Sequence, residues 1–266
     1  MHKDHPALHE ATRLFVEQQL MGLEQDLQRA KKIKATITSL KGLYAELDPV
    51  AEKVAKEASS PCEAGCNHCC YILTLCSIPE GLVLAEAVLK RPDWKAVGRD
   101  LRQMAKVTCN PELTHGLYFR KQLACALLDK KTGQCSAYAE RPSACRFHYV
   151  ITEPELCSIG PEPKSVKVID FRDLERRVWA HCAQLFPMTM TAPLPLVVLF
   201  CMPMLKKDKY FRQLLSGLPD PARWFYVVRE QIPQLAKEAV GERGGEIVLN
   251  RSNLTEETAD EDEDAG

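Results

Sequence analysis

Two groups of cysteines constrain this chain more than any other feature of its sequence. The first group is a nine-residue run that contains Cys62, Cys66, Cys69 and Cys70. The second group is more widely spaced and consists of Cys125, Cys135, Cys145 and Cys157. The chain has 12 cysteines in 266 residues, which is below the density of a secreted disulfide scaffold, and residues 1–15 mix charges and histidines where a signal peptide needs an apolar run. We therefore expect a cytoplasmic protein whose reduced thiols bind metal.

The spacing within the first group suits a metal-binding loop. Two residues separate Cys66 from Cys69, so both sulfurs can face one ion, and a loop curled like a helical turn brings Cys62 into reach. The neighbouring Gly65 and Asn67 allow the partly left-handed backbone that such loops use. Cys70 follows directly, and adjacent side chains tend to diverge. It therefore completes this site, serves a second metal, or remains a nearby reactive thiol.

Residues 61–160 resemble the YkgJ-like cysteine-cluster proteins, which are described as zinc- or iron-chelating. Three motifs carry the resemblance: the run of four cysteines, a later cysteine pair around a glycine turn, and the segment Tyr138-x-x-Arg141-Pro142-x-x-Cys145-Arg146. The resemblance implies a metal site assembled from both groups. Its motif positions are Cys62, Cys66, Cys69, Cys70, Cys125, Cys135 and Cys145, and Cys157 is similar to a late cysteine found in many members. The chain departs from the pattern in its three-residue first gap and in His148-Tyr149 after the Cys-Arg pair.

Eight thiolates exceed the four ligands of one tetrahedral ion. Three arrangements stay open: two zinc ions, one iron–sulfur cluster with spare cysteines, or one zinc ion with the other thiols packed nearby. His68 and His148 are alternative ligands, and His148 is favoured because it lies where the family pattern changes. Arg141 and Arg146 either neutralise a thiolate-rich site or have a structural role, such as anchoring the turn at Pro142.

The rest of the sequence predicts a mainly α-helical protein in four parts. These are a long helical arm at 1–60, the cysteine module with loops and a small hairpin at 61–160, a helical region at 161–250 and a disordered acidic tail at 251–266. Helical periodicity begins near Val16, and Asp48-Pro49 predicts that a second helix starts there and runs to about Ala58. Later helices are expected at 79–89, 93–105, 168–185, 194–202, 210–218 and 223–240. No strand–helix alternation indicates a Rossmann sheet or a β/α barrel.

Other functional classes find little support. The chain has no glycine-rich phosphate loop, GxSxG elbow or HExxH pair. Its formal net charge of −1 includes seven acidic residues at 254–266 and leaves about +6 elsewhere, but no basic stripe or motif supports nucleic-acid binding. The apolar run at 186–205 contains four prolines and is expected to be buried rather than to span a membrane.

Three functional hypotheses follow. The main one is a protein that binds zinc or an iron–sulfur cluster through both cysteine groups. The second is an enzyme with SAM-dependent or redox activity, because some larger proteins with a similar module act as protein lysine methylases; a radical SAM enzyme is disfavoured because the barrel pattern is absent. The third is an adaptor with structural zinc whose N-terminal helices bind a protein partner or a second copy. The sequence identifies no catalytic residue.

Overall fold

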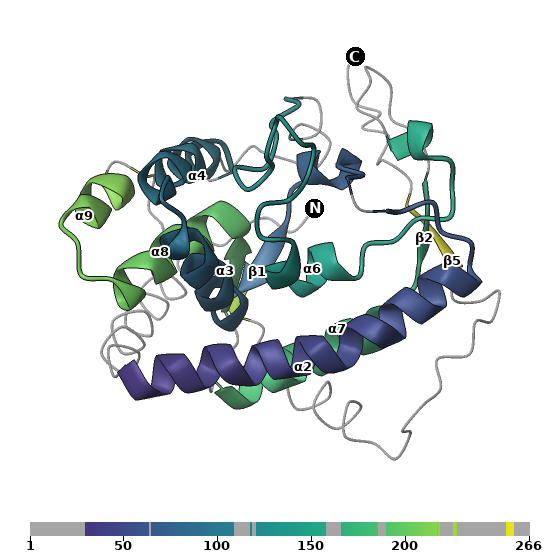
Figure 1. Ribbon diagram of the computed structural model, residues 1–266, viewed down its shortest axis with the longest axis horizontal. Helices are drawn as coiled ribbons and strands as arrows, with labels where there is room; N and C mark the ends of the chain where they lie inside the picture. The colour runs from purple at the N-terminus through teal and green to yellow at the C-terminus, as the bar shows by residue number, and fades with distance from the viewer. Residues whose placement is uncertain are drawn as a thin grey trace, which may run out of the picture.

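The protein is mainly α-helical, as the sequence predicts, and Figure 1 shows the arrangement of its helices in a computed structural model. The structure describes residues 30–63, 65–108, 118, 121–157, 166–185, 190–216, 218, 226–227 and 254–257. The first part of the expected helical arm and most of the expected acidic tail lie outside these residues.

The longest element is helix α2 (Ala30–Glu57), which runs along one side of the molecule (Figure 1). Leu40, Leu47 and Ala51 are buried along one face, where α2 packs on α3 (Ile78–Lys90) and α7 (Arg172–Leu185). The predicted helix boundary at Pro49 is wrong, because α2 continues through this proline. The buried face extends beyond it, and tertiary packing of that face offsets the lost backbone hydrogen bond.

Helices α3 and α8 (Leu194–Leu205) form the centre of the core, flanked by α4 (Trp94–Thr108) and α9 (Tyr210–Leu215). Helix α8 is apolar on all sides and almost wholly buried, as expected for residues in the 186–205 run. It crosses α3 closely at Gly81, where a Cβ atom would overlap the side chain of Val197. Within the part of the chain that the structure describes, no helix has the length and apolarity needed to cross a membrane.

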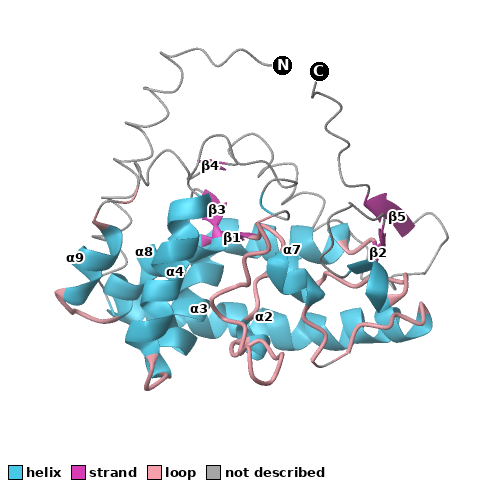
Figure 2. Ribbon diagram, turned by 90° about the horizontal axis from the view of Figure 1, so that it is seen from above, coloured by secondary structure: helices cyan, strands magenta, loops and turns pink. Residues whose placement is uncertain are grey.

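Short strands complete the fold, and the sequence predicted none of them (Figure 2). One antiparallel sheet has the order β1 (Leu75–Ser77), β3 (Met190–Pro193), β4 (Tyr226–Val227), with Cys76 opposite Ala192. A second pairs β2 (Val166–Ile169) with β5 (Leu254–Glu257), so that Val166 faces Glu257.

These strands correct three predictions. The helix expected from residue 168 begins only at Arg172. The helix expected at 223–240 is described only at residues 226–227, which form β4. The tail at 251–266 was expected to be disordered, but its described residues form β5. Strands of two to four residues carry too little periodicity to be recognised, and each depends on a distant partner.

Four short elements surround the cysteines. They are the 3-10 helices η1 (His68–Tyr71), η2 (Tyr138–Glu140) and η3 (Pro154–Cys157), and the single-turn helix α6 (Ser143–Arg146). Between them, Leu128 and Cys135 form an antiparallel bridge that closes a turn. Gly133 in this turn has a φ of +71°, a conformation that glycine adopts without steric cost. The turn agrees with the hairpin expected here.

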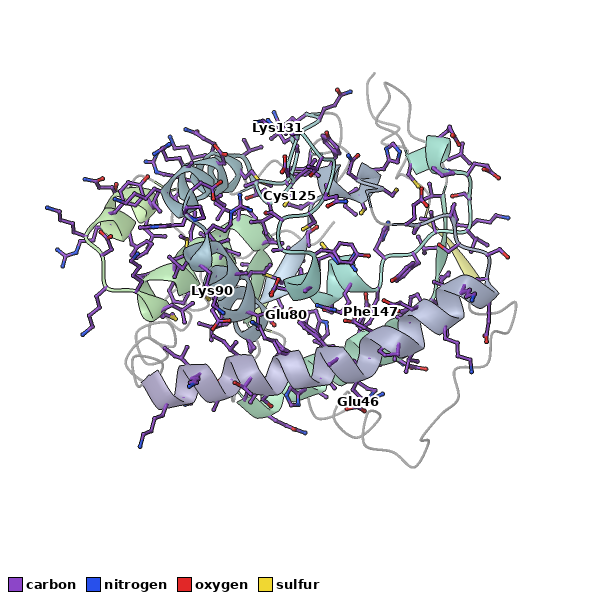
Figure 3. All side chains as sticks on the ribbon, in the orientation of Figure 1. Glu46, Glu80, Lys90, Cys125, Lys131 and Phe147 are labelled. Atoms are coloured by element: carbon purple, nitrogen blue, oxygen red, sulfur yellow. The ribbon has the colours of Figure 1, made fainter. Side chains whose placement is uncertain are left out.

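A buried carboxylate joins three helices at the base of this module. Glu80 is 2% exposed and lies where α3 and α6 face α2 (Figure 3). Its Oε2 accepts hydrogen bonds of 2.8 Å from the backbone N–H and the hydroxyl of Ser77, which caps α3. Its Oε1 accepts the backbone N–H of Ser143 at 2.7 Å and the hydroxyl of Tyr44 at 3.2 Å. Each carboxylate oxygen thus accepts two hydrogen bonds, which offset the cost of burying the carboxylate.

A buried guanidinium provides the second connection. Arg146 in α6 is 2% exposed and lies over the ring of Tyr44, 3.8 Å from its centroid. Its Nη1 donates to both carboxylate oxygens of Asp48 at 2.6 Å, and its remaining nitrogens donate to the carbonyls of Ala139 and Arg141. Asp48 therefore anchors the cysteine module to α2 instead of capping a new helix.

We expect opposite effects from alanine at two helical glycines. Gly81→Ala should lower the free energy of unfolding by about 1–3 kcal/mol, because the added methyl group overlaps Val197 at the crossing of α3 and α8. Gly42→Ala in α2 should raise it by about 0.5–1 kcal/mol, because no atom lies within 4 Å of the added methyl group and alanine favours the helix. Urea denaturation followed by circular dichroism measures both changes. Equal effects of the two substitutions would contradict the close helix crossing.

We also expect Asp48→Ala to lower the free energy of unfolding by about 2 kcal/mol, because it leaves the buried Arg146 without its carboxylate. The control is Glu46→Ala on the same helix, which removes an exposed pair with Arg177 and should cost about 0.5 kcal/mol or less. The same denaturation experiment distinguishes them. A loss for Asp48→Ala as small as that of the control would refute the anchoring role of Asp48.

Candidate metal centre

The first cysteine group lies in a loop that ends in η1. Cys66 donates its backbone N–H to the carbonyl of Glu63 at 3.1 Å, and Cys70 donates to Asn67 at 2.9 Å. Gly65 has a φ of +99°, which is the left-handed conformation expected from the sequence. Asn67 has a φ of −127° and does not adopt it. Two tight turns thus hold the four cysteines of this loop in a small volume.

The second cysteine group wraps around this loop. The backbone N–H of Cys125 donates to the carbonyl of Cys70 at 2.7 Å, which joins the two groups directly. A Cβ atom on Gly133 would lie 3.0 Å from Nδ2 of Asn67, so the turn of the second group packs closely on the first. The backbone N–H of Val150 donates to Sγ of Cys62 at 3.4 Å. Segments separated by 55 or more residues therefore meet here.

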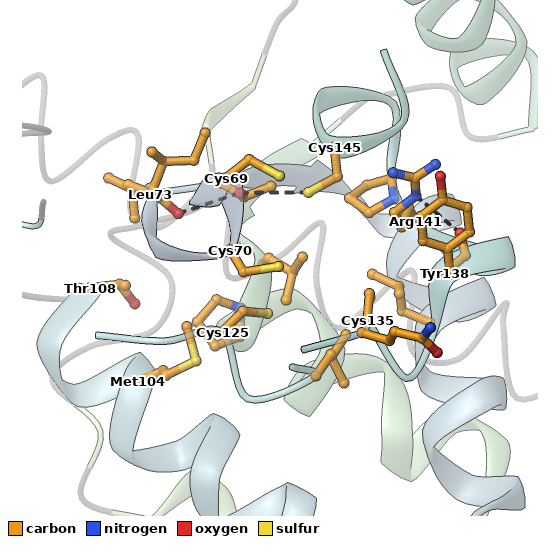
Figure 4. Close-up of a pocket in the computed structure, with 18 of the residues that line it drawn as sticks. Cys69, Cys70, Leu73, Met104, Thr108, Cys125, Cys135, Tyr138, Arg141 and Cys145 are labelled. Atoms are coloured by element: carbon orange, nitrogen blue, oxygen red, sulfur yellow. Dashed lines mark hydrogen bonds between the residues drawn. The ribbon is translucent and has the colours of Figure 1, made fainter. Parts of the chain in front are cut away.

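Cysteines of both groups line one cavity of about 290 Å³ (Figure 4). The cysteines in its wall are Cys66, Cys69, Cys70, Cys125, Cys135 and Cys145. The first three come from the loop and η1, the next two from the turn, and the last from α6. The structure thus brings together six of the eight cysteines that the sequence analysis singled out.

The other two, Cys62 and Cys157, lie outside the wall of this cavity. Cys157 ends η3, which contacts η1. Burial raises the pKa of the Cys157 thiol to about 11, and the charges of Cys62 and Cys66 contribute to the same shift. Both cysteines therefore lie in or near the first loop but outside the cavity wall.

Hydrogen bonding and burial set the protonation of the thiols. The thiol of Cys70 hydrogen-bonds to Cys69 and is the main reason why the pKa of Cys69 falls to about 6, with smaller contributions from the charges of His148 and Arg141. The same bond raises the pKa of Cys70. Burial raises the pKa of Cys125 to about 11 and also raises that of Cys145. These shifts favour the thiolate form at Cys69 and the protonated form at its neighbours, and metal binding to a protonated thiol displaces its proton.

The donor set fits a thiolate-binding metal, although the side chains are not arranged as a finished coordination shell. The eleven cysteines within the described residues are all free thiols. Among those residues, no three His, Cys, Asp or Glu side chains are positioned as ligands of one ion. Thiolates are soft ligands that suit zinc and iron–sulfur centres. A cysteine side chain can reorient by rotation about χ1 alone, without a change in the backbone.

The two arginines have different positions. Arg141 lines the cavity, where its guanidinium stacks on Tyr138 at 3.6 Å and its Nε donates to the Tyr138 carbonyl at 3.0 Å. Arg146 is held by Asp48 on the other side of α6. Neither His68 nor His148 lines the cavity, and both are half-buried. Of the two, His148 acts electrostatically on Cys69.

Three further cysteines, Cys76, Cys182 and Cys201, are buried in the core and do not line the cavity. Cys109 lies outside the described residues.

Sequence analysis missed Asp48 and Glu80 as anchors of the module. The Ser77-x-x-Glu80 capping box was a visible signal for Glu80, whereas nothing local marked Asp48 as the partner of Arg146.

A comparison with protein families finds a match over the cysteine module. Residues 61–166 match the model of the family described as "CxxCxxCC: Putative zinc- or iron-chelating domain". Comparison with curated proteins gives no match, and comparison with solved structures gives none. The matched region contains both cysteine groups, and its description agrees with the expected zinc or iron. Residues 61–166, about two fifths of the chain, are therefore similar to the domain described as zinc- or iron-chelating.

Proposed function

We propose that this protein binds zinc or an iron–sulfur cluster through thiolates contributed by both cysteine groups. The observation that carries the proposal is the shared cavity, in which six cysteines from segments far apart in the sequence face a common space. The backbone hydrogen bond from Cys125 to Cys70 supports it, because it joins the two cysteine groups directly beside this space.

The eight cysteines divide into two sets of four. The inner set comprises Cys70, Cys125, Cys135 and Cys145, all of which line the cavity. The outer set comprises Cys62, Cys66, Cys69 and Cys157, which lie in or against the first loop; Cys66 and Cys69 also reach the cavity wall, whereas Cys62 and Cys157 do not. Four thiolates suit one tetrahedral zinc ion or one cluster. Two neighbouring centres therefore account for all eight cysteines, which a single ion does not.

The surrounding residues have a supporting role in this proposal. Four thiolates around a divalent ion leave a net negative charge, and the Arg141 guanidinium at the cavity wall offsets part of it. The Val150 N–H donates to the Cys62 sulfur, an interaction that stabilises thiolate ligands. Metal binding would fasten the first loop, the turn and α6 to one another and so contribute directly to folding.

The first test is the metal content of Cys125→Ser compared with that of Cys201→Ser. Cys125 belongs to the inner set, so its replacement should remove at least half of the bound metal. Cys201 is fully buried in α8, away from the cavity, and its replacement should leave the metal content unchanged. Anaerobic purification followed by elemental analysis gives the stoichiometry, and absorption near roughly 400 nm together with sulfide identifies an iron–sulfur cluster. Full metal retention in Cys125→Ser would refute this ligand assignment.

The second test distinguishes two centres from one. Cys157→Ser and Cys135→Ser should each remove about half of the metal, and the double variant should remove nearly all of it, because the two residues serve different sets. If there is a single centre, replacing one of its ligands would abolish metal binding, and replacing a cysteine that is not a ligand would have no effect. The double variant would then bind as much metal as the more strongly affected single variant. The same elemental analysis gives the result.

A further inference from the structure

The cavity is larger than a metal centre requires. Its volume of about 290 Å³ is roughly twice that of an engineered 150 Å³ cavity known to bind benzene. The cysteines occupy only part of its wall. The rest is formed by the helical core and the segments next to it, through Leu73, Leu84, Met104, Tyr118, Leu127 and Leu194.

Both threonine hydroxyls in the apolar part of the wall are already bonded within the protein. The Thr108 hydroxyl donates to the carbonyl of Ala105 at 3.4 Å. The Thr74 hydroxyl donates to the carbonyl of Ile72 at 3.5 Å and accepts from the thiol of Cys145. A polar ligand would find few partners here, and a water molecule needs two to four of them. This part of the cavity therefore favours an apolar occupant.

The apolar end of the cavity also has no charged side chain among the described residues. Among the lining residues that the structure describes, Arg141 is the only one with a permanent charge. Its guanidinium lies beside Tyr138, near the cysteines (Figure 4), and not at the end formed by Met104 and Thr108. A charged group placed at the apolar end would lose its hydration without a counter-charge.

We propose that this cavity binds a neutral, apolar small molecule of about the size of an indole ring, with one edge facing the cysteines. Ligand pockets of proteins are mostly apolar with a few polar groups at one end, and this cavity has that composition. The inference goes beyond metal binding, because the apolar wall comes largely from residues that no metal would contact.

The test is the binding of indole to the full chain, measured by calorimetry and by the shift in unfolding temperature. Met104→Trp places an indole ring of its own at the cavity wall and should weaken binding roughly tenfold or more. The control, Gln103→Trp, adds the same side chain to the exposed face of α4 and should bind indole like the unmodified chain. Indole-3-acetate, which adds a carboxylate, should bind more weakly than indole.

Three outcomes would overturn the inference: no binding of indole to the unmodified chain, equal binding by Met104→Trp, or preference for indole-3-acetate. If Met104→Trp does not fold, Thr108→Leu reduces the same cavity with a smaller change and should also weaken binding. Elemental analysis of each sample separates this inference from the metal proposal. A chain that holds metal but not indole refutes only the cavity ligand, and a chain that binds indole without metal refutes only the metal centre.

Discussion

The architecture depends on two buried charges that connect helices to loops. Glu80 joins α2, α3 and the start of α6, and Arg146 joins the end of α6 to α2. Burying a charge is costly unless hydrogen bonds and a counter-charge replace water. Because both groups need several partners at fixed positions, they restrict how the cysteine module can sit on the helices. The position of Cys145, which lies on α6 between these anchors, follows from that restriction.

Six cysteines and side chains of the helical core line one cavity, and this has consequences for both. Leu84 and Met104 belong to helices that precede the second cysteine group, yet they face the same space as Cys125 and Cys145. The module is therefore not a self-contained zinc finger added to a helical protein. Metal binding and packing of the core should be coupled, since the loops that carry the thiolates also close the apolar interior.

Sequence reasoning was most successful where the signal is local. The helices α3, α4 and α8 carry clear apolar periodicity or a continuous apolar run, and each was predicted to within a few residues. The strands were missed because their stability comes from partners far away in the chain, and Pro49 was misjudged because local propensity was outweighed by packing. Arg146 allowed two interpretations in the sequence, and only its burial against Asp48 shows the structural one.

The sequence by itself determined which atoms are available for chemistry: soft sulfur donors, spaced so that a loop can gather several of them, in a family-typical order. That information is local, because ligand type and short spacings are properties of neighbouring residues. Tertiary structure decided which sulfurs share a space, with six around the cavity and Cys62 and Cys157 outside it. It also decided that the space has an apolar wall, because burial and long-range contacts depend on how distant helices pack and are not encoded in any one segment.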